Sequence, residues 1–73
     1  MNELPSNQVL SYLNQKVTIV IIPKGNKAVL QTNVNGEWVT IEEYIENASI
    51  DITMRDNIEW RVTLDTTAEA YYY

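Results

Sequence analysis

The residues that could carry chemistry are few, and their types exclude most catalytic machinery. The chain of 73 residues contains neither His nor Cys, so it lacks the commonest general base and the thiol nucleophile. Ser6, Ser11 and Ser49 would each need a Lys or a carboxylate as the base, and none lies in a recognisable nucleophile turn. We therefore expect a protein without catalytic residues and without a cofactor, which is not an enzyme.

Glycines and carboxylates also lack the spacing of a ligand site. Gly25 and Gly36 stand alone in separate segments, which is typical of turns and not of a phosphate-binding loop. Glu46 lies four residues after Glu42 and three after Glu43, so they would share one side of a helix, where they could hold a hard cation weakly. Because no oxygen-rich loop with an ordered set of ligands surrounds them, the sequence favours a solvated acidic surface and predicts no metal site.

The distribution of charge restricts the class of partner. The net charge is -5, and it is uneven along the chain: residues 1–36 carry one acid against three lysines, whereas residues 37–73 carry nine acids against two arginines. An acidic surface repels phosphate backbones and anionic membranes. Direct nucleic-acid binding would require the side carrying Lys16, Lys24 and Lys27 to dominate. We expect no nucleic acid and no membrane, but a protein with a basic surface or a second copy of the chain.

Aromatic side chains complete the candidate partner-binding set. Trp38 follows the Asn-Gly pair at residues 35–36, whereas Trp60 falls on the apolar face of a strand and is expected in the core. The run of tyrosines at the end of the chain suggests a docking segment, because Tyr is enriched at interfaces; the alternative is a tail without a role. The predicted partner-binding residues are Trp38, Glu42, Glu46, Tyr71, Tyr72 and Tyr73.

The first half of the chain predicts a short helix followed by three strands. Ser6 or Asn7 could cap a helix over residues 6–14, with Val9, Leu10 and Leu13 on one stripe. Alternating or β-branched apolar residues then predict strands, and a Pro-Lys-Gly-Asn-Lys turn and the Asn-Gly pair separate them. These strands cover residues 16–22, 28–34 and 37–40.

The second half predicts another short helix and two strands. Thr40 and Glu43 match a capping box, and the apolar residues from Ile41 to Ala48 recur at i, i+3, i+4 and i+7. A helix over 41–48 is therefore expected, with a single long strand as the competing interpretation. Two strands with one apolar and one polar face follow, joined by a polar turn. They cover residues 49–54 and 58–64, with the turn at 55–57.

This order of elements predicts a mainly β (α+β) fold, with a five-stranded antiparallel sheet or a small barrel and two short helices. A short helix leading into five strands, with Leu-Asn-Gln-Lys-Val-Thr-Ile-Val at residues 13–20, resembles the Sm-like and SH3-like small barrels. The resemblance covers only the element order and that stretch, and the glycine that bends the second Sm strand is missing. It implies a barrel shape and ring-like self-association. Residues 1–65 would form one domain, and residues 66–73 a Tyr-rich C-terminal tail without a partner strand.

Size and composition point to a function based on binding. A domain of 8.4 kDa has a thin core and usually needs extra stabilisation, which oligomerisation supplies where disulfides are excluded. Without a signal-peptide pattern or a long apolar stretch, we expect a cytoplasmic protein. The sequence favours a homo-oligomeric assembly module or regulatory adaptor. The alternative is a small acidic inhibitor, of the phage or mobile-element type, that docks on a basic, nucleic-acid-binding host protein.

Overall fold

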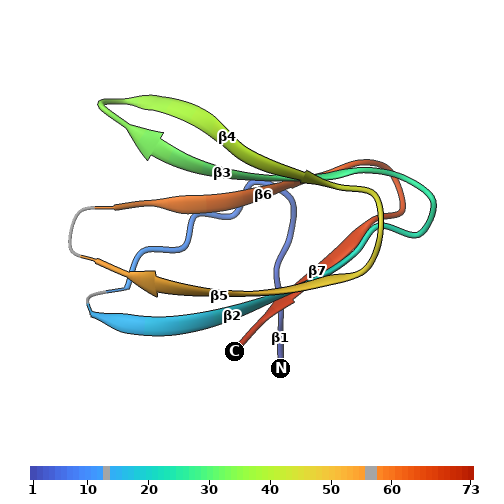
Figure 1. The fold of residues 1–73 in the computed structure, drawn as a ribbon, viewed down its shortest axis with the longest axis horizontal. Coiled ribbons are helices and arrows are strands. Elements are labelled where there is room, and N and C mark those ends of the chain that lie inside the picture. The colour runs from blue at the N-terminus through green and yellow to red at the C-terminus, as the bar shows by residue number, and fades with distance from the viewer. Residues whose placement is uncertain (13, 56–57) are drawn as a thin grey trace.

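Seven antiparallel strands form two sheets in the computed structural model of the protein, which describes residues 1–12, 14–55 and 58–73 (Figure 1). One sheet has the strand order β1-β7-β2-β5 and the other the order β4-β3-β6. The strands are β1 (Asn2–Glu3), β2 (Gln15–Ile22), β3 (Ala28–Val34), β4 (Glu37–Tyr44), β5 (Ala48–Met54), β6 (Trp60–Leu64) and β7 (Glu69–Tyr72).

The mainly β composition fits the prediction, but the predicted architecture was wrong. The described residues contain no helix, and seven strands in two sheets replace the single five-stranded sheet or barrel. The chain crosses from one layer to the other after β2, after β4, after β5 and after β6, so strands adjacent in the sequence often lie in different sheets (Figure 1). The barrel resemblance therefore does not extend to the fold.

The core lies between the two layers. Alternation along β2 buries Val17, Ile19 and Ile21 completely or nearly so, and β3 buries Ala28 and Leu30 in the same way from the opposite sheet. Both strands are central in their sheets, which explains their regular burial. The remaining buried residues of this cluster are Leu4, Leu10, Ile52, Met54, Val62 and Ala70.

The N-terminal segment forms a turn at Ser6 and Asn7 and then runs beside β6, where a helix over 6–14 was predicted; Leu13 of that helix lies outside the described residues. The capping side chains bind β6 instead of a helix terminus: Ser6 Oγ accepts the Leu64 N–H at 2.9 Å, and Asn7 Oδ1 accepts the Thr63 hydroxyl at 2.7 Å. Leu10 forms a backbone bridge with Trp60. Burial of Leu4 and Leu10 in the core outweighs the weak propensity of so short a helix.

The predicted helix over 41–48 is also absent, because strand β4 continues to Tyr44 and β5 begins at Ala48. The ladder between β3 and β4 contains a bulge: Leu30 pairs with Glu42, whereas Gln31 pairs with Thr40. The extra residue, Ile41, shifts the alternation by one position. The spacing that imitates a helix joins Ile41, the bulged residue, to Tyr44 at the end of β4, Ile45 in the connection and Ala48 at the start of β5.

The tyrosine-rich segment is part of a sheet. Strand β7 pairs with β2 on one side and with β1 on the other, and Tyr71 lies opposite Val20. Lys24 Nζ contacts Glu69 Oε1 at 2.9 Å, and this hydrogen-bonded ion pair lowers the pKa of the Glu69 carboxyl. The expectation that the segment lacks a partner strand was wrong, because its partner comes about fifty residues earlier in the chain.

Candidate functional site

The β3–β4 hairpin is built by a turn that the sequence specifies. Asn35 and Gly36 adopt φ values of 53° and 86°, as a two-residue turn of the mirror-image type requires. Asn33 Oδ1 accepts the Gly36 N–H at 2.9 Å and fastens the turn. In Figure 1 the hairpin lies at the top of the molecule, with its tip directed away from the sheet that contains β2 and β5.

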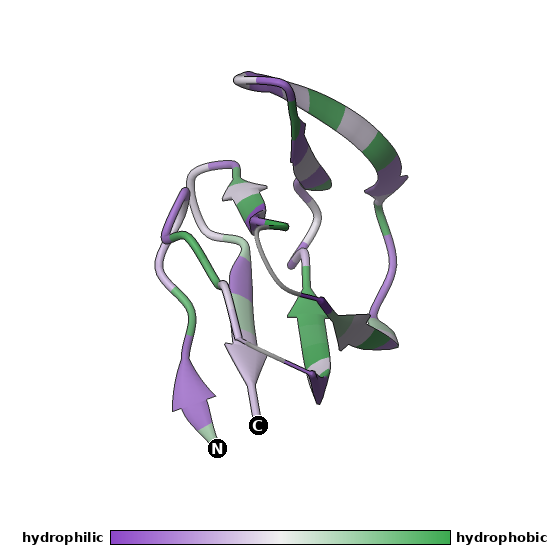
Figure 2. Ribbon diagram, turned by 90° about the vertical axis from the view of Figure 1, so that its left-hand side faces the viewer, coloured by the Kyte–Doolittle hydropathy of each residue, from purple (hydrophilic) through white to green (hydrophobic). Residues whose placement is uncertain are grey.

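Exposed apolar side chains gather on this hairpin. Among the described residues, seven large hydrophobic residues are exposed, and four of them fall between positions 34 and 45. Figure 2 shows the result as alternating green and purple segments along the strands at the top of the molecule. The four are Val34 (49% exposed), Val39 (42%), Ile41 (52%) and Ile45 (74%).

The register explains why these residues are exposed. Val39 pairs with Thr32, so it lies on the same face of the sheet as the buried Leu30. Within the described chain, β4 makes extensive contacts only with β3, so the facing sheet does not cover this end of the hairpin. Tyr44, at the other end of β4, packs against the core. The strand therefore runs from an anchored end to an uncovered one.

Acidic residues surround the apolar ones. Residues 37–46 contain four glutamates and no Lys or Arg. Glu43 contacts Lys27 Nζ at 3.2 Å, whereas among the described residues Glu37, Glu42 and Glu46 form no ion pair. The hairpin and the residues directly after it thus combine exposed apolar surface with the negative charge of these three glutamates.

A tyrosine hydroxyl adjoins this charge. Tyr44 OH donates a hydrogen bond to Glu42 Oε2 at 3.0 Å. Partial burial and this contact with the carboxylate raise the pKa of Tyr44 to about 12, since both disfavour a second negative charge there. The Tyr44 hydroxyl therefore stays protonated at neutral pH and holds the Glu42 side chain at the base of the hairpin.

On its other face, the hairpin carries an aromatic contact. The Arg61 guanidinium lies 4.2 Å from the centre of the Trp38 ring, in the range of a cation–π interaction. Arg61 Nε also donates to Gln31 Oε1 at 2.8 Å. Trp38 is half-buried by these neighbours, so the β6 strand fixes its position on the sheet surface.

The backbone of β4 has an open hydrogen-bonding edge. The N–H of Asn33 donates to the Glu59 carbonyl, on the β6 side of β3, so Asn33 and its partner Trp38 form a pair without hydrogen bonds between them. The backbone groups of Trp38 therefore point away from β3, and alternation directs those of Thr40 the same way. No strand of the described chain pairs with this edge.

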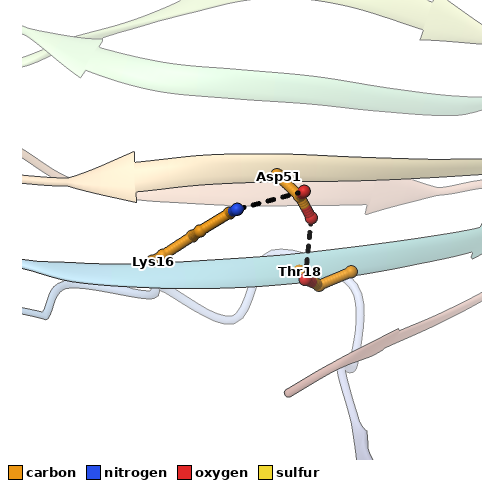
Figure 3. Close-up of polar contacts among 3 residues, drawn as sticks. All are labelled: Lys16, Thr18 and Asp51. Carbon is orange, nitrogen blue, oxygen red and sulfur yellow. Dashed lines mark hydrogen bonds and ion pairs between the residues drawn. The ribbon is translucent and has the colours of Figure 1, made fainter.

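The edge strand β5, at the end of the other sheet, is chemically different. Its apolar Ile52 and Met54 are buried, and its exposed positions are polar. Asp51 accepts a hydrogen bond from the Thr18 hydroxyl at 2.8 Å and contacts Lys16 Nζ at 3.6 Å (Figure 3). These contacts, the hydrogen bond first, lower the pKa of Asp51. The charge on β5 is thus compensated within the molecule.

The structure divides the predicted partner-binding residues between two regions. Trp38, Glu42 and Glu46 all lie on or directly after β4, so they fall within the acidic, apolar hairpin. Sequence reasoning missed its exposed aliphatic residues, because apolar residues alternating along a strand indicate core. The absence of any Lys or Arg between residues 37 and 46 is the signal that could have identified this segment.

The tyrosines form a separate surface on the other sheet. Tyr72 packs against the core, whereas Tyr71 and Tyr73 fall on the outer face beside Val20. Val20 and Ile22 are half-buried there, and Tyr73 is exposed. The outer face of β2 and β7 is therefore more apolar than an ordinary solvent-facing sheet.

A cavity of about 230 Å³ lies where the N-terminal segment meets the β6–β7 connection, with Glu3, Asp65 and Glu69 among its lining residues. Within the part of the chain that the structure describes, no group of three or more acidic, His or Cys side chains is placed to hold a metal ion. The described residues also include no helix with the length and hydropathy needed to cross a membrane.

Comparisons with protein-family models, with curated proteins and with solved structures found no match to this chain. The arguments for function therefore depend on the geometry and chemistry of the molecule itself.

Proposed function

We propose that the protein is a non-enzymatic binding module whose β3–β4 hairpin docks on a basic surface of another protein. A single observation carries this proposal: of the seven large apolar residues exposed in the described chain, four lie beside four glutamates in the β3–β4 hairpin and the two residues that follow it. Clustered exposed apolar side chains are typical of interaction surfaces. The surrounding negative charge would steer a basic partner and disfavour an acidic one.

An inhibitory or regulatory role accords with this surface. A protein of this size can act by covering a functional surface on its partner, and a basic surface of that kind is typical of proteins that bind nucleic acids. The hairpin would supply aliphatic contacts at the centre of the interface and carboxylates around it. This arrangement resembles the apolar core and polar rim of protein interfaces.

Selection from a library of displayed random peptides tests the docking surface. The bait is the full chain, and the matched control is the double variant Val39→Thr and Ile41→Thr, which keeps β-branched residues but removes apolar surface. We expect basic peptides that bind the natural chain and lose most of their affinity for the control. Peptides that bind both proteins equally would contradict a role for the hairpin.

Self-association is the second candidate function, and the outer face of β2 and β7 favours it. Val20 lies opposite Tyr71 there, and Ile22 and Tyr73 extend this face along β2 and beyond the end of β7. Light scattering over a tenfold concentration range measures the molar mass. A multimer that Tyr71→Ser and Tyr73→Ser convert to a monomer would support this function, and a monomer at all concentrations would contradict it.

A further inference from the structure

We infer that the occupant of the β4 edge is an extended segment of another protein, which adds to the sheet as an eighth strand and carries basic residues on either side of an apolar centre. The inference rests on the proposed function and specifies its binding mode. It follows from three features of the same strand: an open backbone edge, apolar side chains at its centre and uncompensated carboxylates around them.

The backbone edge provides the first argument. The backbone N–H and C=O of Trp38 point away from β3, because the N–H of its partner Asn33 donates to the Glu59 carbonyl on the β6 side. Such an edge is a template for another strand unless the protein blocks it. No proline and no lysine occurs from residue 37 to residue 46, so the protection of this edge is limited to its glutamates and to the bulge at Ile41. A basic strand would neutralise the glutamates.

The side chains set the chemistry of the added strand. Val39 and Ile41 are 42% and 52% exposed, and they would contact apolar residues of a neighbouring strand. Glu37 precedes them, whereas Glu42 and Glu46 follow them. A segment with an apolar centre and Lys or Arg at both ends therefore matches β4 along its whole length.

Charge argues against a second copy of the chain as the occupant. Antiparallel pairing of two β4 strands about Thr40 would place Glu37 opposite Glu43 of the other copy, twice in the dimer. Like charges directly opposite each other on neighbouring strands are destabilising, and Lys27 lies beside only one of these glutamates. A basic segment removes this conflict.

A matched set of peptides tests the inference by calorimetry on the full chain. The probe is Lys-Lys-Val-Thr-Val-Thr-Lys-Lys, which has the same length as β4, eight residues. One control peptide has the same sequence with N-methyl groups on alternate amides, so that it keeps its charge but cannot form a ladder. A second replaces each lysine by glutamate. We expect the probe to bind, and both controls to lose about tenfold or more in affinity.

Two proline variants locate the edge. Thr40→Pro removes an outward-pointing N–H of β4, whereas Thr53→Pro does so on the edge of β5, and both replace an exposed threonine. Proline is tolerated at such edge positions because no backbone hydrogen bond of the sheet is lost. Thr40→Pro also removes the 3.3 Å hydrogen bond that Gln31 Nε2 donates to Thr40 Oγ1, so Thr40→Val is the control for that side-chain contact. We expect Thr40→Pro to weaken probe binding by about tenfold and Thr53→Pro to leave it within a factor of about two, with both variants folded by circular dichroism.

Each other outcome has a distinct meaning. Equal binding of the N-methylated peptide, or equal effects of the two prolines, would overturn strand addition while leaving the docking hairpin intact. No binding up to about millimolar probe would overturn the inference, and hairpin-dependent peptides from the random library would still support the proposed function. A dimer of the free protein that Thr40→Pro dissociates would overturn it in favour of self-pairing.

Discussion

Two of the edge strands, β4 and β5, are joined by the short segment at residues 45–47 and yet present opposite surfaces. Strand β5 buries Ile52 and Met54 and compensates its exposed Asp51 within the sheet. Strand β4 exposes Val39 and Ile41, and among the described residues its Glu37 and Glu42 form no ion pair, whereas Glu43 contacts Lys27. Both edges lack a neighbouring strand in the described chain, so the difference between them lies in the side chains.

The comparison teaches that exposure of an edge is not sufficient to identify an interface. The exposed residues of β5 are polar, and its Asp51 is paired within the sheet, so this edge can face solvent, as edges of natural sheets commonly do. The same protection is missing from β4, although the bulge at Ile41 twists that strand locally. We therefore propose that the binding edge is β4 and not β5.

The largest expected effect is the difference in stability loss between a buried side chain of β5 and an exposed side chain of β4. Ile52→Ala should lower the free energy of unfolding by about 2–4 kcal/mol, because it leaves a cavity in the core. Ile41→Ala should change it by less than about 0.5 kcal/mol, because that side chain is already in solvent. Chemical denaturation measures both, and similar losses would show that β4 is covered in the free protein.

Gly36 tests whether the hairpin turn maintains the β4 edge. Its φ of 86° is strained for any residue with a Cβ, so Gly36→Ala should destabilise the fold by about 1–2 kcal/mol. The control is Gly36→Asn, since Asn tolerates positive φ better. Thermal unfolding compares the variants; equal destabilisation by Ala and Asn would mean that backbone strain is not the cause.

Acid titration tests the internal compensation of charge on β5. The pKa of Asp51 is lowered in the folded state, so its contribution to stability is present above pH about 4 and is lost as the pH falls through the lowered value. Asp51→Asn should reduce stability at neutral pH and weaken its fall on acidification. Unfolding by urea at several pH values measures this.

The matched variant on β4 is Glu37→Gln. It should leave stability at neutral pH within about 0.5 kcal/mol, because Glu37 has no ion pair among the described residues. A loss as large as that of Asp51→Asn would show that the two edges compensate charge in the same way.

The smallest effect concerns the anchored end of β4. Because burial and Glu42 raise the pKa of Tyr44 to about 12, stability from the protonated phenol is present below pH 10 and is lost as the pH rises toward 12. Glu42→Gln should lower this pKa, whereas Glu46→Gln should leave it unchanged. Ultraviolet titration of tyrosinate in Tyr44→Phe assigns the transition, and no change with Glu42→Gln would contradict the contact.

Local patterns predicted much of the strand content, but not its assembly. Strand β3 matches its predicted range of 28–34, because regular alternation is bounded by two turns with distinct residues. The predicted turn at 55–57 includes Asp56 and Asn57, which lie outside the described residues. The helix predicted at 41–48 was wrong because its apolar residues belong to the bulged strand β4, to the connection at 45–47 and to the start of β5. Strand β7 was missed because its pairing with β2 depends on residues far apart in the chain.

The candidate site was only partly predictable for the same reason. Charge and aromatic content identified Trp38, Glu42 and Glu46 from local sequence alone. The exposure of Val39 and Ile41 depends on how far the facing sheet extends, which no local pattern records. An apolar residue in an alternating strand belongs to the core or to an interface according to that tertiary arrangement.

The most direct test of the β4 edge as the binding surface is an NMR titration of the ¹⁵N-labelled protein with the lysine-flanked peptide. We expect the amide resonances of Trp38 and Thr40 to shift and these amides to become protected from hydrogen exchange, while the amides of Asp51 and Thr53 on β5 do not change. Changes centred on Val20 and Tyr71, or equal changes on both edges, would contradict it.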